Sequence, residues 1–598
     1  MSGRIVIPSL MKCITTFLVL LGLIPAVFAQ SAESPKYEFR SAWVATAVGL
    51  DFPRGSTAVQ QEAALRNIIR NMKAHGMNAV VFQASPRGDA YYRSERLPWA
   101  RRLSGTMGQD PGWDPLQVAI EEAHANGMEL HAWYNFGKIG DIGTADLQDS
   151  DDPRHVYFGR PDLVATVGNE VWLNPGIPEA REWAIANVME IVNNYDVDAV
   201  HFDFIRYGTS SYSGDIALRN EHDPGMDMAP WRRHNITRFA TGAHDAIKAV
   251  KPWVKVGSTP LGHYKESGGW PANLAYAQVF QDSRLWLQLG QHDYLAPQIY
   301  WGIGNQDDAP RFEWLVNDWM GETYDRHIYV GTAPYKSFVM AELPAQIDTT
   351  RAHGAHGQIH FRYQTVALGF PYENRYARPA LVPPMEWLNM TPPAAPQGFG
   401  YEWDDEVVTL RWAPPEASDA DAETRYYAVY RIQSAQEPDF TAALADPGNL
   451  LAVTGDTLIL DSPADVSESY YYVVTSVSRN WVESVRTDAI VIEGRATDTE
   501  TTRLHLFSLE QNFPNPFANS TTVGFSLQNA GSVTLRVYNV LGQVVATLAD
   551  NESFAAGPHT MSWTPVRGDG TSLASGTYFY SLEVDGVRET KRMTVLTR

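Results

Sequence analysis

The stretch 197–207, VDAVHFDFIRY, decides the fold of this chain. Its apolar run, 197–202, is the signature of a strand that is buried on both faces. A helical segment, 178–194, precedes the run, and a carboxylate, Asp203, ends it. Helix, buried strand and charged loop in this order form one unit of a repeating βα architecture, where residues at the C-terminal ends of strands do the chemistry. The pattern predicts a functional carboxylate at Asp203. The alternative is that Asp203 caps the next helix or pairs with Arg206.

Seven further segments of the same kind flank this strand. They cover residues 40–46, 78–83, 128–135, 254–259, 293–300, 327–332 and 357–363, and helical segments separate most of them. Eight β/α units in a region of this size predict an α/β fold, a (β/α)8 TIM barrel over residues 36–390. Two long insertions, 137–172 and 208–229, follow the third and fourth strands. We expect both to wall a groove at the C-terminal face of the barrel.

The remaining chain predicts two all-β sandwich domains after a proline-rich segment, 383–396. Residues 396–495 resemble a fibronectin type III domain through WAPP (412–415) and a tyrosine-rich strand, which implies a spacer or binding module. Residues 503–598 contain NFPNPF (512–517), VYNVLGQVV (537–545) and SGTYFYSLEVDG (575–586). These motifs resemble the C-terminal sorting domain of type IX secretion substrates. The resemblance implies export across an outer membrane, with the export machinery as a partner.

The N-terminus predicts a signal peptide over residues 1–29. Arg4 and Lys12 precede an apolar run, and residues 26–29 end it with the small-x-small pattern of a cleavage site. The run has about 15 residues, too few for a membrane span of about 20. Cys13, the single cysteine, lies within the peptide, so the mature chain has no thiol. We therefore expect a secreted or cell-surface protein, on the exterior of the outer membrane, without a transmembrane segment.

The net charge limits the class of partner. The 598 residues carry 47 Lys and Arg against 69 Asp and Glu, a formal charge of −22. This balance argues against nucleic acid as a partner. Metal-site motifs such as HExxH and phosphate-binding glycine loops are absent from the sequence, so we expect neither a metal nor another cofactor.

Several strand-end motifs in order resemble those of the glycosyl-hydrolase-like family 10. They are RSAWVAT (40–46), Gln83 with PRGD (86–89), HAWYN (131–135), NPG (174–176), HFDFIRY (201–207) and APQIYW (296–301). The family consists of (β/α)8 proteins of bacterial envelopes. The resemblance implies hydrolysis of O-glycosyl bonds and, for some relatives, cleavage of peptidoglycan glycan strands.

Glycoside hydrolysis needs an acid and a group that stabilises or traps the anomeric carbon. Asp203 is the predicted acid, and His201, on the same side of the strand, is placed to hold or tune it. For the second catalytic group the prediction is Asp89, with Asp141 and Asp51 as other choices. A further route needs no second carboxylate, because an N-acetyl group of the sugar can act as the nucleophile. Gln298 and Tyr300 would then orient that group.

The predicted substrate-binding residues are aromatic, amide and cationic side chains near strand ends. Aromatic rings bind the apolar faces of sugars, and arginines bind hydroxyls or a carboxylate such as a lactyl group. Core packing of the rings and pairing of the arginines with acids are the alternatives. The set is Arg87, Trp133, Asn135, His201, Arg206, Tyr207, Gln298, Tyr300 and Trp301.

The sequence thus favours a secreted or surface-attached hydrolase of a bacterial glycan, with peptidoglycan strands first. One alternative is a hydrolase of an external plant or algal polysaccharide. The other is a surface carbohydrate-binding protein without turnover. The carboxylate at the end of a barrel strand, Asp203, argues against a pure binder.

Overall fold

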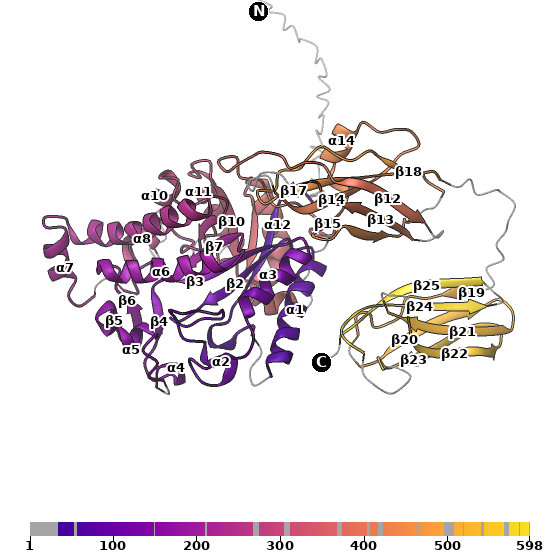
Figure 1. The fold of residues 1–598 in the computed structure, drawn as a ribbon, viewed down its shortest axis with the longest axis horizontal. Coiled ribbons are helices and arrows are strands. Elements are labelled where there is room, and N and C mark those ends of the chain that lie inside the picture. The colour runs from indigo at the N-terminus through magenta and orange to yellow at the C-terminus, as the bar shows by residue number, and fades with distance from the viewer. Residues whose placement is uncertain are drawn as a thin grey trace, which may run out of the picture.

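The structure, a computed structural model, describes most of the chain (Figure 1). The described residues are 34–52, 57–148, 150–209, 212–266, 274–303, 311–367, 374–403, 407–416, 423–463, 467–494, 507–517, 519–539, 543–566, 573–584 and 587–596. The predicted signal peptide, residues 1–29, lies outside them. Among the helices of these ranges, none combines the length and apolar character that crossing a membrane requires.

Eight parallel strands close into a barrel, which confirms the predicted fold class. Around the barrel the order is β1-β11-β10-β9-β8-β7-β3-β2, and β2 pairs with β1 to close it. The strands are β1 (Phe39–Val44), β2 (Ala79–Ser85), β3 (Glu129–Asn135), β7 (Ala199–Asp203), β8 (Lys255–Ser258), β9 (Tyr294–Leu295), β10 (His327–Thr332) and β11 (Gly357–His360).

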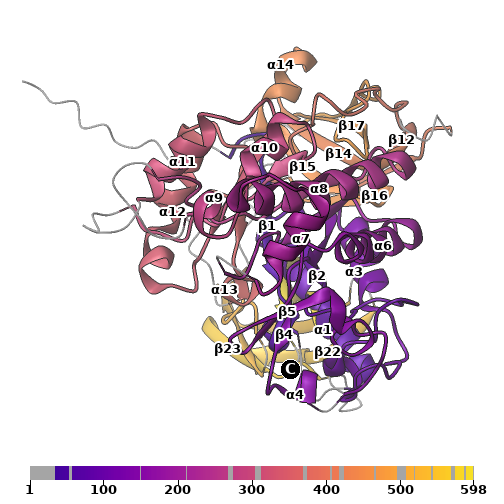
Figure 2. The same ribbon diagram turned by 90° about the vertical axis from the view of Figure 1, so that its left-hand side faces the viewer.

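Helices follow the strands and surround the barrel (Figure 2). The first of them begins with a capping box, in which Thr57 and Gln60 satisfy each other's backbone N–H groups. The barrel helices are α1 (Ala58–Ala74), α2 (Arg101–Ser104), α3 (Pro115–Ala125), α6 (Pro178–Asn194), α8 (Met228–Val250), α9 (Ala275–Gln278), α10 (Ser283–Gln288), α11 (Phe312–Met320), α12 (Ser337–Ala352) and α13 (Tyr363–Ala367), with a 3₁₀ helix η1 (Ala47–Gly49) after β1.

The two predicted insertions lie after β3 and β7, on the C-terminal side of the barrel. The first forms a small antiparallel sheet in the order β4-β6-β5. Its elements are β4 (Lys138–Asp141), α4 (Ala145–Gln148), α5 (Val156–Gly159), η2 (Pro161–Leu163), β5 (Val164–Val167) and β6 (Glu170–Leu173). The second insertion contributes α7 (Asp215–His222).

A β-sandwich packs against the opposite, N-terminal end of the barrel. Sheets β12-β13-β16 and β15-β14-β17-β18 form it. Tyr426 and Trp481 of the sandwich share a core with Phe39 and Tyr329 of the barrel, and the hydroxyl of Tyr426 donates to the carbonyl of Met128. The elements are β12 (Gln397–Trp403), β13 (Val408–Ala413), β14 (Thr424–Gln433), α14 (Phe440–Ala445), η4 (Pro447–Asn449), β15 (Leu450–Thr454), β16 (Leu458–Asp461), β17 (Tyr470–Ser478) and β18 (Ile490–Ile492).

The C-terminal region forms two further antiparallel sheets, β19-β20-β23 and β22-β21-β24-β25, around their own core. The strands are β19 (Phe507–Leu509), β20 (Thr521–Leu527), β21 (Gly531–Tyr538), β22 (Val544–Phe554), β23 (Gly557–Trp563), β24 (Gly576–Val584) and β25 (Val587–Val595). All-β structure after the barrel was predicted from the alternating pattern and is confirmed.

Candidate active site

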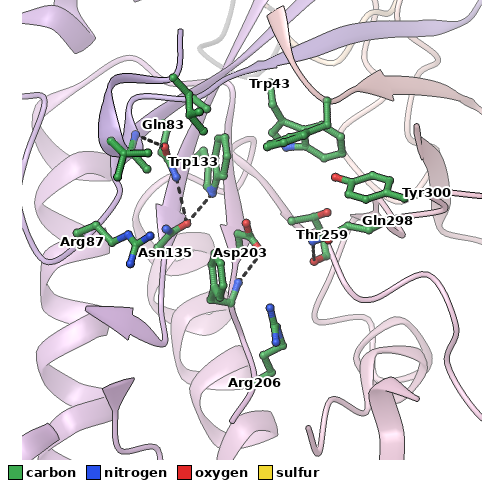
Figure 3. Close-up of a pocket in the computed structure, with 16 residues that line it drawn as sticks. Trp43, Gln83, Arg87, Trp133, Asn135, Asp203, Arg206, Thr259, Gln298 and Tyr300 are labelled. Atoms are coloured by element: carbon green, nitrogen blue, oxygen red, sulfur yellow. Dashed lines mark hydrogen bonds between the residues drawn. The ribbon is translucent and has the colours of Figure 1, made fainter. Parts of the chain in front are cut away.

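A cavity of about 220 Å³ opens at the C-terminal ends of the barrel strands (Figure 3). Seven of the predicted site residues line it: Arg87, Trp133, Asn135, Asp203, Arg206, Gln298 and Tyr300. The other lining residues are Trp43, Ala45, Ala47, Val48, Leu50, Gln83, Phe204, Thr259 and Phe361. Asp203 supplies the only carboxylate among the described residues of this lining.

Asp203 ends β7 and is buried, with 7% of its surface exposed. Its carboxylate accepts a 2.6 Å hydrogen bond from the backbone N–H of Phe204. Burial raises the pKa of Asp203 to about 6, although the positive charge of Arg206 and the Phe204 N–H oppose the rise. A carboxyl group with this pKa is partly protonated near neutral pH and is therefore able to act as a general acid.

Phe204 has a left-handed backbone, with φ at +54°. A phenylalanine in this region is strained, and such strain is held in place only by its surroundings. The conformation lets the Phe204 N–H bond the neighbouring carboxylate, and the Phe204 ring contacts the guanidinium of Arg206 at 4.9 Å from its centroid. Phe204 thus contacts both the predicted acid, Asp203, and the cation Arg206.

The wall formed by β2 and β3 is fixed by hydrogen bonds. The indole N–H of Trp133 donates to the Asn135 side-chain oxygen at 2.8 Å, and the Asn135 amide donates to the carbonyl of Pro86 at 2.6 Å. The Gln83 side-chain oxygen accepts from the backbone N–H groups of Thr46 and Ala47. This bonding holds the face of Trp133 at the cavity in one orientation (Figure 3).

The opposite wall carries Gln298 and Tyr300. The amide of Gln298 donates to the carbonyl of Thr259 at 3.2 Å, and the side chain lines the cavity. The ring of Tyr300 stacks on Phe361, with centroids 6.0 Å apart. Burial, with a contribution from the charge of Asp203, raises the pKa of Tyr300 well above its usual value, so its hydroxyl keeps its hydrogen.

His201 lies below the cavity in the barrel interior. Its Nε2 accepts a 3.0 Å hydrogen bond from the indole N–H of Trp43, which lines the cavity. Burial holds the pKa of His201 well below its usual value. The neutral ring therefore carries its hydrogen on Nδ1, which lies 2.9 Å from the hydroxyl of Tyr294. His201 is placed to hold Trp43 and has no place in the cavity lining.

The same chain of hydrogen bonds continues to the bottom of the barrel. The hydroxyl of Tyr294 lies 2.8 Å from Nδ1 of His131, and Nε2 of His131 lies 2.7 Å from the carboxylate of Glu129. The buried ammonium of Lys255 also bonds Glu129. Burial alone would raise the pKa of Glu129, but the charge of Lys255 holds it below its usual value. The ionised carboxylate of Glu129 thus begins the series of hydrogen bonds that ends at Trp43 in the cavity.

Asp89 lies in a separate, smaller cavity of about 20 Å³ beside the first. It accepts a 3.0 Å hydrogen bond from the backbone N–H of Arg87 and so closes the turn that carries Arg87. Burial, and then the charge of Asp146, raise the pKa of Asp89 to about 7. Asp141, another predicted choice, pairs with Arg87 at 2.9 Å, and Asp51 pairs with Arg362 at 2.8 Å.

Two predicted sugar-binding aromatics also lie outside the lining. Tyr207 is fully buried and packs on Tyr212 and Phe280, with centroids 4.8 Å and 5.5 Å away. Trp301 packs against the core on the outer side of the barrel. For these two rings the alternative interpretation from the sequence, core packing, describes their position better than sugar contact.

Thr259 and Phe361 also line the cavity, Trp172 lies against Arg206 beside it, and none of the three was predicted. Thr259 directly follows β8, so the strand-end rule would have found it. Trp172 comes from the inserted strand β6, and its indole lies against Gly137 and Gly208. A Cβ atom on Gly208 would lie 2.3 Å from the Trp172 ring. These two glycines, two residues after β3 and five residues after β7, are the sequence signal that a ring packs closely there.

No group of three or more His, Cys, Asp or Glu side chains in the described ranges is arranged to hold a metal ion. The residues that line the cavity offer a carboxylic acid, two arginine cations, neutral hydrogen-bonding groups and aromatic faces.

Comparisons with known proteins place this architecture among glycosyl hydrolases. Residues 38–343 match the family "Glycosyl hydrolase-like 10", and residues 515–587 match the "FlgD Ig-like domain". The chain is 33% identical over 512 residues to "Glycosyl hydrolase YngK" of Bacillus subtilis, covering 79% of this chain and 98% of that protein. It is 33% identical over 339 residues to "Glycosyl hydrolase DigH" of Escherichia coli, covering 52% of this chain and 76% of that protein.

One solved structure with a similar fold is the glycoside hydrolase domain of PgaB from Bordetella bronchiseptica. It is 14% identical, with a TM-score of 0.41 over 57% of this chain and 98% of that domain.

Proposed function

Because the chain belongs to the glycosyl hydrolase-like 10 family, it is a glycoside hydrolase, and we propose that it cleaves a bacterial glycan, with peptidoglycan strands as the first substrate. The observation that carries the proposal is Asp203. Its carboxyl group lies at the C-terminal end of a barrel strand, in an aromatic cavity, with a pKa of about 6.

Asp203 acts as the general acid in this proposal. Its protonated form gives a proton to the glycosidic oxygen as the bond to the anomeric carbon breaks. Trp43, Trp133 and Tyr300 offer ring faces that suit sugar rings, and the hydroxyl of Tyr300 adds a polar group. The bonded Asn135 and Gln83 keep this surface preorganised, so little binding energy is spent in ordering it.

The second catalytic group is the N-acetyl carbonyl of the substrate in this proposal. Gln298 and Tyr300 would position the N-acetyl group, since both side chains line the cavity across from Asp203 and the hydroxyl of Tyr300 points into it (Figure 3). Asp89 fits the role of second carboxylate less well, because it lines a different cavity.

We further propose that the protein works outside the cytoplasm. The predicted signal peptide (1–29) and the tail (503–598), with its resemblance to type IX sorting domains, support export and attachment at the cell surface. The region 396–495, with its resemblance to fibronectin type III, would serve as a support for the barrel, because it packs on the barrel end away from the site.

A substrate screen tests the proposed function. The purified protein is incubated with peptidoglycan glycan strands and, separately, with plant and algal polysaccharides, and soluble products are identified by mass spectrometry. Release of N-acetylated oligosaccharides from the glycan strands is the expected result. If products form only from a plant or algal polysaccharide, the substrate is not a glycan of the bacterial cell wall. If the protein binds a glycan but releases no product, it acts as a carbohydrate-binding protein and the proposal is wrong.

A further inference from the structure

We propose that Arg206 forms a subsite for a carboxylate carried by the glycan beside the bond that is cleaved. The inference rests on the proposed function, since it names a chemical group of the same substrate. Arg206 follows Asp203 by three residues and reaches into the cavity from the same loop (Figure 3).

The guanidinium of Arg206 has no ion pair within the described part of the chain. Its contacts are with two rings, those of Phe204 at 4.9 Å and Trp172 at 5.7 Å from the centroids. The carboxylates of Asp203 and Glu170 are near enough to influence it by charge, but among the described residues no carboxylate oxygen lies within 4.0 Å of an Arg206 nitrogen. Burial lowers the pKa of Arg206. Arg206 is partly buried, so its charge is partly removed from water, and an anionic ligand would offset that cost.

The other arginine of the cavity provides the contrast. Arg87 is neutralised by Asp141, with 2.9 Å between nitrogen and oxygen. Asp141 also pairs with Lys138, whose second partner is Glu170, so these two cations face two carboxylates. When Asp203 holds the proton that catalysis requires, the side chain of Arg206 carries the uncompensated charge of the cavity. The single positive charge of Arg206 would be neutralised by a ligand group with one negative charge.

Residues of the inserted sheet β4-β6-β5 hold the side chain of Arg206 in place. The indole N–H of Trp172 donates to Glu170 at 2.9 Å, which fixes the ring on which the guanidinium lies. Gly137 leaves room for the ring, since a Cβ atom there would lie 2.9 Å from Trp172 and 2.6 Å from the carbonyl of Phe204. Rings on the faces of a guanidinium leave its N–H edge open for a partner in the plane.

A carboxylate is the monoanion whose geometry suits that edge. The planar fork of arginine donates two parallel hydrogen bonds to the two oxygens of a carboxylate. Sugars bear such a group as a lactyl ether or as the C6 acid of a uronic acid. The subsite therefore predicts an acidic sugar next to the scissile bond.

The test pairs two substrates with two enzymes. The substrates are oligosaccharides of N-acetylglucosamine and N-acetylmuramic acid that differ only in their lactyl groups, free carboxylate in one and carboxamide in the other. Wild type should favour the carboxylate in kcat/KM by about 10- to 100-fold, as expected for a charge-assisted bidentate contact. Arg206→Gln should remove this preference, and Arg206→Lys should retain a part of it.

The ratio of kcat/KM for the two substrates reports on the subsite alone, because a change in the acid Asp203 affects both values alike. Arg160→Gln is the matched control. Arg160 is an exposed arginine of the first insertion, 137–172, and it pairs with Asp162. This variant should keep the full preference.

Equal rates on the two substrates with wild type, or an unchanged preference in Arg206→Gln, would overturn the inference. If wild type hydrolyses neither substrate, the proposed glycan is wrong, and calorimetric binding of the same two oligosaccharides decides the subsite alone. Tighter binding of the carboxylate that depends on Arg206 supports the subsite. Equal binding overturns it.

Discussion

The indole N–H of Trp481, in the β-sandwich, donates a 2.5 Å hydrogen bond to Glu129, at the start of barrel strand β3. Both side chains are buried, with 1% and 0% of their surface exposed. Glu129 begins the chain of hydrogen bonds through His131 and Tyr294 to His201, which holds Trp43 at the cavity. The sandwich therefore completes the polar interior of the barrel.

The contact predicts that Trp481→Phe lowers the free energy of unfolding by about 1–3 kcal/mol, because the buried carboxylate of Glu129 loses a donor. The phenyl ring keeps the stacking on Tyr426, where the centroids are 5.0 Å apart. Urea unfolding followed by circular dichroism measures the change. Tyr401→Phe, at an exposed ring of the same sandwich, should change the stability by less than about 0.5 kcal/mol. Equal stabilities of all three proteins would show that the Glu129 contact contributes nothing.

The pKa of Asp203 predicts the pH dependence of hydrolysis. The acid form is the active form, so kcat/KM should be constant below pH 6 and fall about tenfold per unit above it. An N-acetyl nucleophile does not titrate in this range, so the profile should have this single limb. Rates measured from pH 4.5 to 8.5 on a soluble oligosaccharide give the profile. A second limb, rising with pH, would favour a carboxylate such as Asp89 as the partner of Asp203.

Buried histidines predict a loss of stability in acid. Burial lowers the pKa of His360, at the end of β11, to about 3. The unfolded chain takes up the proton near pH 6.5, so the stabilising contribution of the neutral ring is present above that pH and lost as the pH falls towards 3. By pH 5 the loss is about 2 kcal/mol.

The variant His360→Gln isolates this effect. Its unfolding free energy should depend less steeply on pH between 7 and 5 than that of the wild type, by about the same 2 kcal/mol. His222→Gln, at an exposed residue of α7, should leave the dependence unchanged. Urea unfolding at the two pH values measures both differences. The same slope in His360→Gln and wild type would contradict the assignment of a neutral buried ring.

Export predicts a shortened N-terminus. The protein recovered from outside the cytoplasm of the native host should begin after Ala29, because the pattern at 26–29 is that of a cleavage site. N-terminal peptide mass spectrometry measures this directly. A mature protein that begins at Met1 in the cytoplasmic fraction would refute the proposed location.

The barrel was predictable because its strands are buried on both faces and therefore appear as continuous apolar runs. The prediction for 293–300 was too long. Strand β9 has the bounds Tyr294–Leu295, and Pro297 lacks the N–H that a longer ladder would need. Pairing resumes only at Gln298, which bridges Leu261 and Gly331.

The site was predictable where strand ends supply it, and less so elsewhere. Alternation along β7 correctly indicates that His201 and Asp203 point to the same side, but it does not give depth. His201 lies two residues lower and meets Trp43 inside the barrel. Trp172 reaches the site from an inserted sheet, so its distance in sequence from β7 conceals its contact with Arg206.

The role of Asp203 is tested most directly by Asp203→Asn, assayed for release of soluble sugars from peptidoglycan glycan strands beside wild type. Asp162→Asn, at an exposed acid of the insertion, controls for the loss of a charge. We predict that Asp203→Asn binds the strands and unfolds as the wild type does, but hydrolyses them at least about 100-fold more slowly, while Asp162→Asn keeps full activity. Hydrolysis by Asp203→Asn at the wild-type rate would contradict Asp203 as the acid.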